Sequence, residues 1–137
     1  MQPLSDHDEV LFRQIHPGFV EDGVPSSQPF RPTPKDQNKL SVDRSSAITP
    51  EASFTLFQEN GGATIAVYGL SVGDFASEAI ICHPDPLPEL NNPAHAIADY
   101  SPHKTSQHKT IAKRLKRLAI ARGCFHPRAS TKAEEKT

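Results

Sequence analysis

The sequence predicts a single small domain of the α+β class, with α/β as the alternative, built from about four strands, two main helices and long proline-rich loops. Two segments, 50–59 and 106–122, carry the end signals and apolar spacing of helices. The expected strands are short apolar or alternating runs at 10–16, 63–70, 79–82 and 94–100. A length of 137 residues with 36% hydrophobic content supports one compact core.

The expected domain covers residues 10–123, between a flexible N-terminal segment at 1–9 and a polar, flexible tail at 124–137. No apolar run reaches the length of a membrane span, and the acidic start lacks the basic and apolar regions of a signal peptide. We therefore expect a cytoplasmic protein with no membrane contact. The two cysteines, Cys82 and Cys124, are too few for a disulfide framework and are expected to be reduced.

The first expected strand, VLFRQIH, alternates between two faces. One face carries Leu11, Arg13 and Ile15, and the other carries Val10, Phe12, Gln14 and His16. Prolines follow at short intervals and remove backbone donors, so 19–39 is expected to form neither a helix nor a central strand. The short run KLSV at 39–42 is expected to pair briefly at a sheet edge.

The helix at 50–59 has the clearest local signals in the chain. Thr49 is a favourable N-cap, Pro50 suits the first helical position, and a glycine pair ends the helix. Its expected packing face consists of Phe54 and Phe57 with either Ala52 or Leu56. The apolar, β-branched run at 63–70 then predicts a strand that is buried on both faces.

Two further helices are expected. SVGDFASEA predicts a short helix capped by Ser71. The helix at 106–122 ends at Gly123, a natural C-cap. Its expected buried stripe consists of Ile111, Leu115, Leu118 and Ala119.

Charge is unevenly distributed along the chain. Residues 104–137 contain ten Lys and Arg against two Glu, a net charge of +8, whereas residues 1–103 contain five Lys and Arg against fourteen acidic residues, a net charge of −9. This separation favours either docking of the basic end on the acidic body or contact with an external polyanion. Charge alone does not choose between them.

The loop at 17–44 is the first candidate binding segment. It is longer than compact domains usually carry, and Phe30, Leu40 and Val42 can anchor it to the core. Its prolines reduce the entropy lost when polar groups are fixed for a partner. The candidate contact residues are Ser26, Ser27, Gln28, Arg31, Lys35, Asp36 and Arg44. The alternative is a solvated connector whose hydroxyls cap its own turns.

Arg13 and His16 are candidate ligand residues on the first strand. If the face that carries His16 opens toward the loop, this histidine with Ser26, Ser27 and Lys35 forms an anion or nucleotide pocket suited to acid–base chemistry. The alternative is that His16 ends the strand and bonds to nearby backbone.

The terminal helix is the candidate polyanion-binding element. Its cations include Lys109, Lys113, Arg114, Lys116 and Arg117. Such clusters bind phosphate backbones through counterion release, but the helix has no Phe, Tyr or Trp for base stacking. The alternative is a solvated helix face that complements an acidic surface of this protein or of a partner.

No metal site and no cofactor are expected. The pairs at 82–83 and 124–126 offer two thiols and two imidazoles, but their spacing departs from that of zinc fingers. The phosphate-binding, dinucleotide-binding, metalloprotease and serine-hydrolase motifs are absent from the sequence.

The stretch LFRQIHPGFVEDGVPSSQPFRPTPKDQNKLSVDR, with NPAHAIADYS and KRLAIARG downstream, resembles a group of small bacterial proteins with no assigned reaction. This resemblance covers most of 10–123 and implies a bacterial, cytoplasmic setting. The opening strand also resembles that of ADP-ribosyltransferase-type folds, which implies that Arg13 or His16 would hold a dinucleotide.

These patterns together favour a small, non-enzymatic interaction or accessory protein. It would bind a macromolecular partner, in the first place a protein, through the 17–44 loop and the basic terminal helix. The alternatives are a binder of, or enzyme on, a nucleotide or phosphorylated ligand, and nucleic-acid binding by the terminal helix. The sequence does not indicate an oligomeric state.

Overall fold

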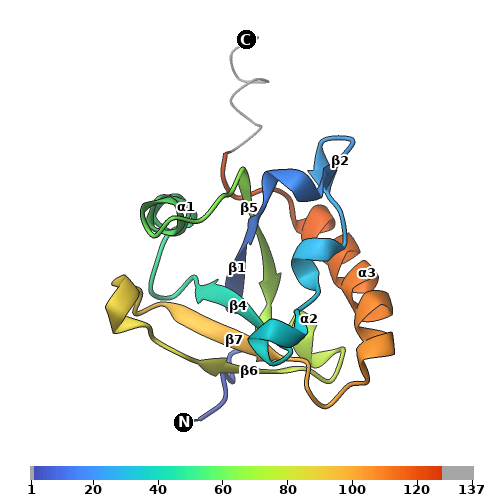
Figure 1. The fold of residues 1–137 in the computed structure, drawn as a ribbon. Coiled ribbons are helices and arrows are strands. Elements are labelled where there is room, and N and C mark those ends of the chain that lie inside the picture. The colour runs from blue at the N-terminus through green and yellow to red at the C-terminus, as the bar shows by residue number, and fades with distance from the viewer. Residues whose placement is uncertain (1, 128–137) are drawn as a thin grey trace.

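A five-stranded antiparallel sheet forms the centre of the protein, in a computed structural model that describes residues 2–127. The strand order is β5-β1-β4-β7-β6 (Figure 1). These strands are β1 (Val10–Ile15), β4 (Lys39–Arg44), β5 (Ala66–Ser71), β6 (Ile81–Pro84) and β7 (His95–Asp99). A separate short hairpin consists of β2 (Val20–Glu21) and β3 (Val24–Pro25). The helices are α1 (Pro50–Glu59), α2 (Val72–Ala76) and α3 (Thr105–Arg122).

This architecture confirms the α+β class and corrects the number of strands, since the described part of the chain has seven. The expectation that 39–42 pairs briefly at a sheet edge is wrong, because β4 is the middle strand of the sheet. The strand was hard to recognise because its buried Leu40 and Val42 alternate with polar residues that face the other side. Strands expected at 10–16, 63–70, 79–82 and 94–100 are present with shifted boundaries.

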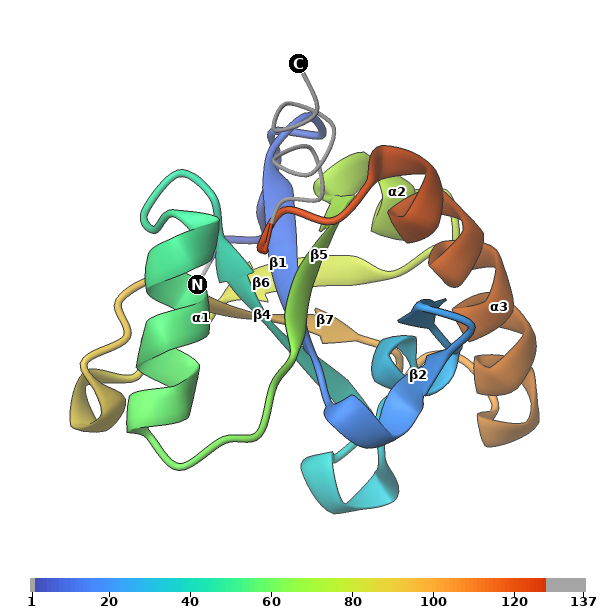
Figure 2. The same cartoon turned by 90° about the horizontal axis from the view of Figure 1, so that it is seen from above.

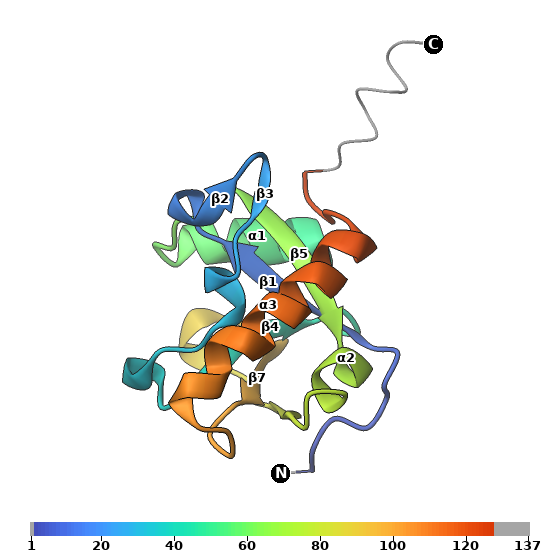
Figure 3. The same cartoon turned by 90° about the vertical axis from the view of Figure 1, so that its right-hand side faces the viewer.

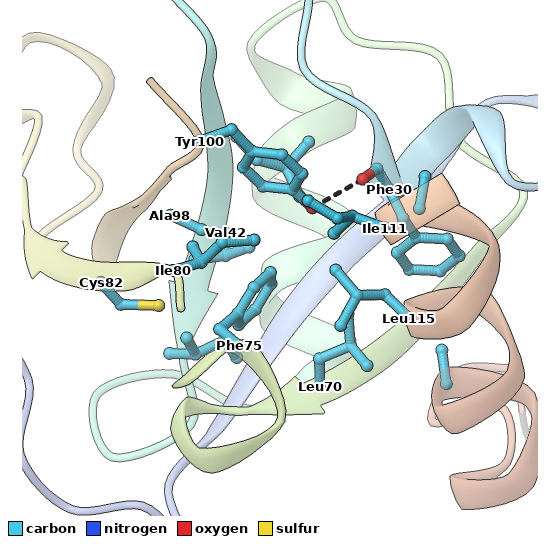
Figure 4. Packing of buried hydrophobic residues seen from close by; sticks show 14 of the residues in the cluster. Phe30, Val42, Leu70, Phe75, Ile80, Cys82, Ala98, Tyr100, Ile111 and Leu115 are labelled. Carbon is cyan, nitrogen blue, oxygen red and sulfur yellow. Dashed lines mark hydrogen bonds between the residues drawn. The ribbon is translucent and has the colours of Figure 1, made fainter. Parts of the chain in front are cut away.

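Helices lie on both faces of the sheet. Figure 2 shows α1 and α3 on opposite sides of it, and Figure 3 shows α3 crossing in front of the strands. The main core lies between the sheet and α3, where Leu11, Leu70, Ile111 and Leu115 are at most 3% exposed. Phe30, Phe75 and Tyr100 fill the space between these layers (Figure 4).

Helix α1 begins and ends where the sequence predicts. The Thr49 hydroxyl accepts a hydrogen bond from the Ala52 backbone N–H at 3.1 Å, and Pro50 occupies the first turn. The expected packing face is wrong in part, because Phe57 is 39% exposed while Ser53 is fully buried. Ser53 faces polar groups of the sheet, so this helix packs through hydrogen bonds as well as apolar contact.

Helix α3 is also confirmed, but its buried stripe differs from the prediction. Leu118 is 39% exposed, whereas His108 is 1% exposed. The Nε2 atom of His108 lies 3.2 Å from the carbonyl oxygens of Tyr100 and His103, and therefore donates to them. A histidine with two backbone acceptors thus occupies a core position that apolar spacing does not reveal.

Strand β5 is buried as predicted, although it lies at the edge of the sheet. The backbone of 125–126 covers this edge, since Val67 N–H donates to His126 at 2.7 Å and Phe125 N–H donates to Val67 at 2.8 Å. Residues 124–127 of the expected tail therefore lie against β5, and 128–137 lie outside the described residues. The pairing protects an edge that would otherwise present free backbone groups.

The expected N-terminal segment is held to the domain by several hydrogen bonds, among them those from the Gly73 and Val72 N–H groups to the His7 and Glu9 carbonyls at 3.0 and 2.9 Å. Leu4 N–H donates to the Cys82 carbonyl at 2.9 Å, and Glu9 forms an ion pair with Arg44 at 3.0 Å. Within residues 2–127, no helix has both the length and the apolar character that crossing a membrane requires.

Candidate functional site

The 17–44 loop is attached to the domain at its middle. The Nε–H group of Arg13 donates to the Pro29 carbonyl at 2.6 Å, and an Nη1–H group of Arg13 donates to the Ser41 carbonyl at 3.0 Å. The Tyr100 hydroxyl donates to the Phe30 carbonyl at 2.6 Å (Figure 4). Phe30 itself is fully buried. These bonds fix the positions of the polar residues just before Pro29.

Burial shifts the pKa values of Arg13 and Tyr100, the two side chains that hold the loop. Burial lowers the pKa of Arg13, and the nearby Tyr100 and Asp36 oppose that change. The guanidinium stays charged at neutral pH because arginine starts so far above it. Burial also raises the pKa of Tyr100 far above its ordinary value, which keeps the hydroxyl protonated as a donor. Both groups therefore serve as permanent hydrogen-bond donors to loop carbonyls.

The attached loop and α3 enclose a polar hollow, called here the basic hollow. It has a volume of about 410 Å³. It is lined by Glu21, Ser26, Ser27, Gln28, Lys113, Lys116 and Arg117. The three cations share one face of α3 because residues three and four apart are neighbours on a helix. Figure 3 shows the loop running beside α3. The structure thus brings together part of the loop set and part of the helix set.

The cations of α3 divide into two groups. Arg114 makes two hydrogen bonds to Glu78, at 2.8 and 2.6 Å, and Arg122 pairs with Asp74 at 2.8 Å. These pairs join α3 to the acidic body, which is the first of the two explanations offered above for the uneven charge. Within residues 2–127, no ion pair involves the remaining cations Lys109, Lys113, Lys116 and Arg117. Most of the positive charge of the helix therefore remains available to an external group.

The hydroxyl and amide groups of the loop are suited to an oxyanion. Ser26 and Ser27 are half-buried, and Gln28 is exposed. The Ser26 hydroxyl accepts from the Gln28 backbone N–H at 3.4 Å, a weak bond that leaves the hydroxyl hydrogen free to donate elsewhere. Charged and neutral donors that converge from two sides favour a carboxylate or a phosphate.

The other predicted contact residues do not line this hollow. The Nδ1 atom of exposed His16 accepts from the Gly18 backbone N–H at 2.9 Å, so this histidine caps its own turn. Arg31 follows the turn Gln28–Phe30, and Lys35 lies in the turn Pro34–Asp36. Asp36 accepts from the Thr33 hydroxyl at 2.9 Å.

Arg44 has a structural contact. Its guanidinium makes a two-pronged pair with Glu9, with both hydrogen bonds at 3.0 Å. The predicted pocket residues do not converge either. Arg13 bonds to loop carbonyls, His16 caps its own turn, and Lys35 lies in the turn Pro34–Asp36. Only the serines reach the basic hollow.

A second hollow, called here the α1 hollow, lies on the other face of the sheet and was not predicted. It has a volume of about 310 Å³ and lies between α1, the 85–92 loop and strands β1, β4 and β7. Its polar lining includes Asp43 and His95, which are opposite each other in the β4/β7 register. They lie 52 residues apart in the sequence, so only strand pairing brings them together. No local pattern marks such a pair.

Neither cysteine belongs to a metal-binding group within residues 2–127. Cys82 is buried, Cys124 is half-buried, and both are free thiols. Burial raises the pKa of Cys82 to about 12, which makes it an unreactive thiol at neutral pH. In the part of the chain that the structure describes, no three His, Cys, Asp or Glu side chains gather closely enough to hold a metal ion.

No protein-family model, curated protein or solved structure matches this chain. Its function is therefore inferred from the two hollows and their chemistry.

Proposed function

We propose that the protein is a small, non-enzymatic interaction protein whose basic hollow binds an acidic segment of a protein partner. One observation carries this proposal: two segments some ninety residues apart, each of them a candidate from sequence alone, form the walls of a single hollow. The loop contributes the neutral donors of Ser26, Ser27 and Gln28 and one exposed carboxylate, Glu21, and the helix contributes three cations, so the hollow carries a net positive charge. Carboxylate side chains accept from both kinds of group.

The strength of such binding depends on charge complementarity. An exposed ion pair contributes only about 0.2–1 kcal/mol, so several pairs and the orienting loop donors are needed together. Lys113, Lys116 and Arg117 provide three cations within two helical turns. The Gln28 amide and serine hydroxyls select where an oxyanion sits. The affinity is accordingly expected to fall as salt is added.

Nucleic acid is the second candidate, because Lys109 extends the row of unpaired cations by one turn beyond the hollow. Phosphate contacts alone supply affinity of this kind. Within α3, however, no aromatic side chain offers a stacking platform for exposed bases. An acidic peptide segment therefore fits the hollow better than single-stranded nucleic acid does.

Charge reversal in the hollow tests this proposal. Fluorescence anisotropy would follow a ten-residue polyglutamate peptide at low salt, with the wild type and with the variant K113E/K116E. The variant should weaken binding at least about tenfold, because two attractive contacts become repulsive. The matched control K35E/K104E makes the same change in net charge at exposed positions outside the hollow, and should change the affinity by less than about threefold.

Three results would overturn the proposal. The peptide fails to bind the wild type, or the control weakens binding as much as K113E/K116E does, or a ten-base-pair duplex binds more tightly than the peptide. The third result would favour nucleic-acid binding by α3.

A further inference from the structure

The α1 hollow exists because α1 covers only part of its face of the sheet. The helix lies over β1 and β5, and the 85–92 loop rises beyond β7 (Figures 1 and 2). The Asn60 side chain donates to the Leu90 carbonyl at 3.1 Å and so ties the end of α1 to this loop. Between these two walls the surface of β4 forms the floor. The hollow is therefore a feature of the fold, with walls that are fixed to each other.

The walls of the hollow are largely apolar. They are formed by Phe12, Leu56, Phe57, Leu87 and Leu90. Phe57 and Leu90 are 39% and 40% exposed, so large apolar surfaces on both walls remain uncovered. A volume of about 310 Å³ is at the lower end of the range of about 300–1,000 Å³ for small-molecule sites. Size and lining match a ligand with a body of one or two rings.

The floor of the hollow ends in a carboxylate. A row of hydrogen bonds runs from Thr64 to Gln14 at 2.9 Å, from Gln14 to Ser53 at 2.9 Å, and from Ser53 to Asp43 at 2.6 Å. Asn92 donates to the other carboxylate oxygen of Asp43 at 2.8 Å. Every donor in this row is neutral, and every bond points toward Asp43. The arrangement holds the carboxylate in one orientation.

Asp43 is 9% exposed, and within residues 2–127 no ion pair involves it. Burying a carboxylate without a cation is costly, and neutral donors recover only part of that cost. A positively charged group that enters the hollow would therefore gain a strong, poorly screened partner. The same charge would repel an anionic ligand. Arg13 also lines the hollow, but its guanidinium donates to the Pro29 and Ser41 carbonyls and forms no ion pair with Asp43.

His95 adds a second acceptor beside Asp43. Its Nδ1 atom lies 2.8 Å from the Asp85 carbonyl and 3.2 Å from the Asp85 carboxylate. Both of these groups are acceptors, so Nδ1 carries the proton. In the neutral ring Nε2 is then an acceptor, and within the described residues it has no hydrogen bond. Two acceptors on facing strands suit a group with several N–H donors.

We propose that the α1 hollow binds a small apolar amine, with its ring system between Phe57 and Leu90 and its protonated amino group paired with Asp43. The ammonium donates to the Asp43 carboxylate and to Nε2 of His95. This site is independent of the proposed function, because no residue lines both hollows.

Three ligands with the same indole body and different charge test the proposal: tryptamine, its neutral alcohol tryptophol, and the anion indole-3-propionate. Isothermal titration at neutral pH and chemical-shift mapping would measure their binding to the full chain. Tryptamine should bind at least about tenfold more tightly than indole-3-propionate, with tryptophol between them. The chemical-shift changes that tryptamine causes in the protein should include those of Asn92 and His95.

A pair of substitutions at matched exposure locates the site. Leu90→Lys places a cation at the rim and should weaken tryptamine at least about fivefold. Leu118→Lys adds the same cation at a 39% exposed leucine on α3 and should leave the affinity within about twofold. Asp43→Asn should abolish the preference for the amine over the alcohol. If the Asp43→Asn variant does not fold, the comparison of L90K with Leu118→Lys still tests the proposal. Equal binding of the three ligands, equal effects of the two lysines, or no saturable binding would each overturn the proposal.

Discussion

At the scale of single residues, the pair of Glu9 and Arg44 has the clearest energetic role. Glu9 is 8% exposed and accepts from Arg44 and from the Ser46 hydroxyl, the latter at 2.6 Å. Burial raises the pKa of Glu9, but the hydrogen bonds from Arg44 and Ser46 and the charge of Arg44 together outweigh burial. The pKa of Glu9 therefore lies below its ordinary value of 4.5. A carboxyl group with a depressed pKa stabilises the folded state when it is ionised.

Substituting Glu9 with Gln should lower the free energy of unfolding by about 1–3 kcal/mol at pH 7, since Arg44 then loses a charged partner. The loss should be complete above pH 4.5, the ordinary value, and should shrink as the pH falls through the lower folded-state pKa. Urea unfolding of both proteins between neutral and acidic pH measures this. Glu59→Gln, at an exposed position, is the control and should stay within about 0.5 kcal/mol. A difference for E9Q that does not depend on pH would contradict the explanation.

At the scale of elements, the sequence predicts the start of a helix correctly where the residues that determine it are neighbours in the chain. Thr49 and Pro50 define the start of α1, and Ser71 defines the start of α2, because caps act within one turn. The middle position of β4 was missed because strand pairing is non-local and a proline-rich segment precedes the strand. Pairing of 125–126 with β5 was missed for the same reason. Short polar ends of a chain carry little pattern that indicates an edge partner.

For the candidate sites too, the sequence indicates the residue types but not which residues pack together. Ser26, Ser27 and the cations of α3 could be named from composition and loop length, but only packing shows which of them meet. Arg13 and Arg44 are charged residues in strands, and the sequence does not show that they hold backbone and Glu9 instead of a ligand. Asp43 was missed because its importance comes from partners 10 and 49 residues away.

The closed edge of β5 gives a test at this scale. A Cβ atom on Gly69 would lie 2.7 Å from the ring of Phe125 and 2.7 Å from Val10. Phe125 in turn packs edge-on against Phe12, with ring centroids 5.4 Å apart. Gly69→Ala and Phe125→Ala should each destabilise the fold by about 1–3 kcal/mol, the first through overpacking and the second through lost contact.

The double variant G69A/F125A should cost at least about 0.5 kcal/mol less than the two single changes combined, because removing the ring gives the new methyl group room. Chemical denaturation of the four proteins gives this coupling. Combining G69A with Phe19→Ala, which removes a 40% exposed ring elsewhere, should be additive. Additivity of G69A with F125A would show that residues 124–127 do not cover the strand in solution.

At the scale of the whole molecule, the sheet separates two surfaces of opposite character. Helices α1 and α3 lie on opposite sides of the sheet (Figure 2). Residues of α3 line the basic hollow, and residues of α1 line the hollow that contains the Asp43 carboxylate. The acidic and basic parts of the sequence are not fully separated in the fold, because Glu78 and Asp74 form ion pairs with two of the α3 cations. What remains is a cationic face and a face with a buried negative charge. A single protein can use such faces for two ligands of opposite charge.

The two hollows should bind their ligands independently, because they share no lining residue and a packed five-stranded sheet lies between them. Saturating tryptamine should change the affinity for the polyglutamate peptide by less than about twofold, and L90K should leave that affinity equally unaffected. Reciprocally, K113E/K116E should not alter tryptamine binding, since a coupling free energy must appear from both sides. Anisotropy with and without the amine measures the first effect, and titration of the variant measures the second. A shared change of about fivefold or more would mean that the sheet transmits binding. The bond from Arg13 to the Pro29 carbonyl would then be the first contact to examine, because Arg13 lines the α1 hollow and holds the loop that lines the basic hollow.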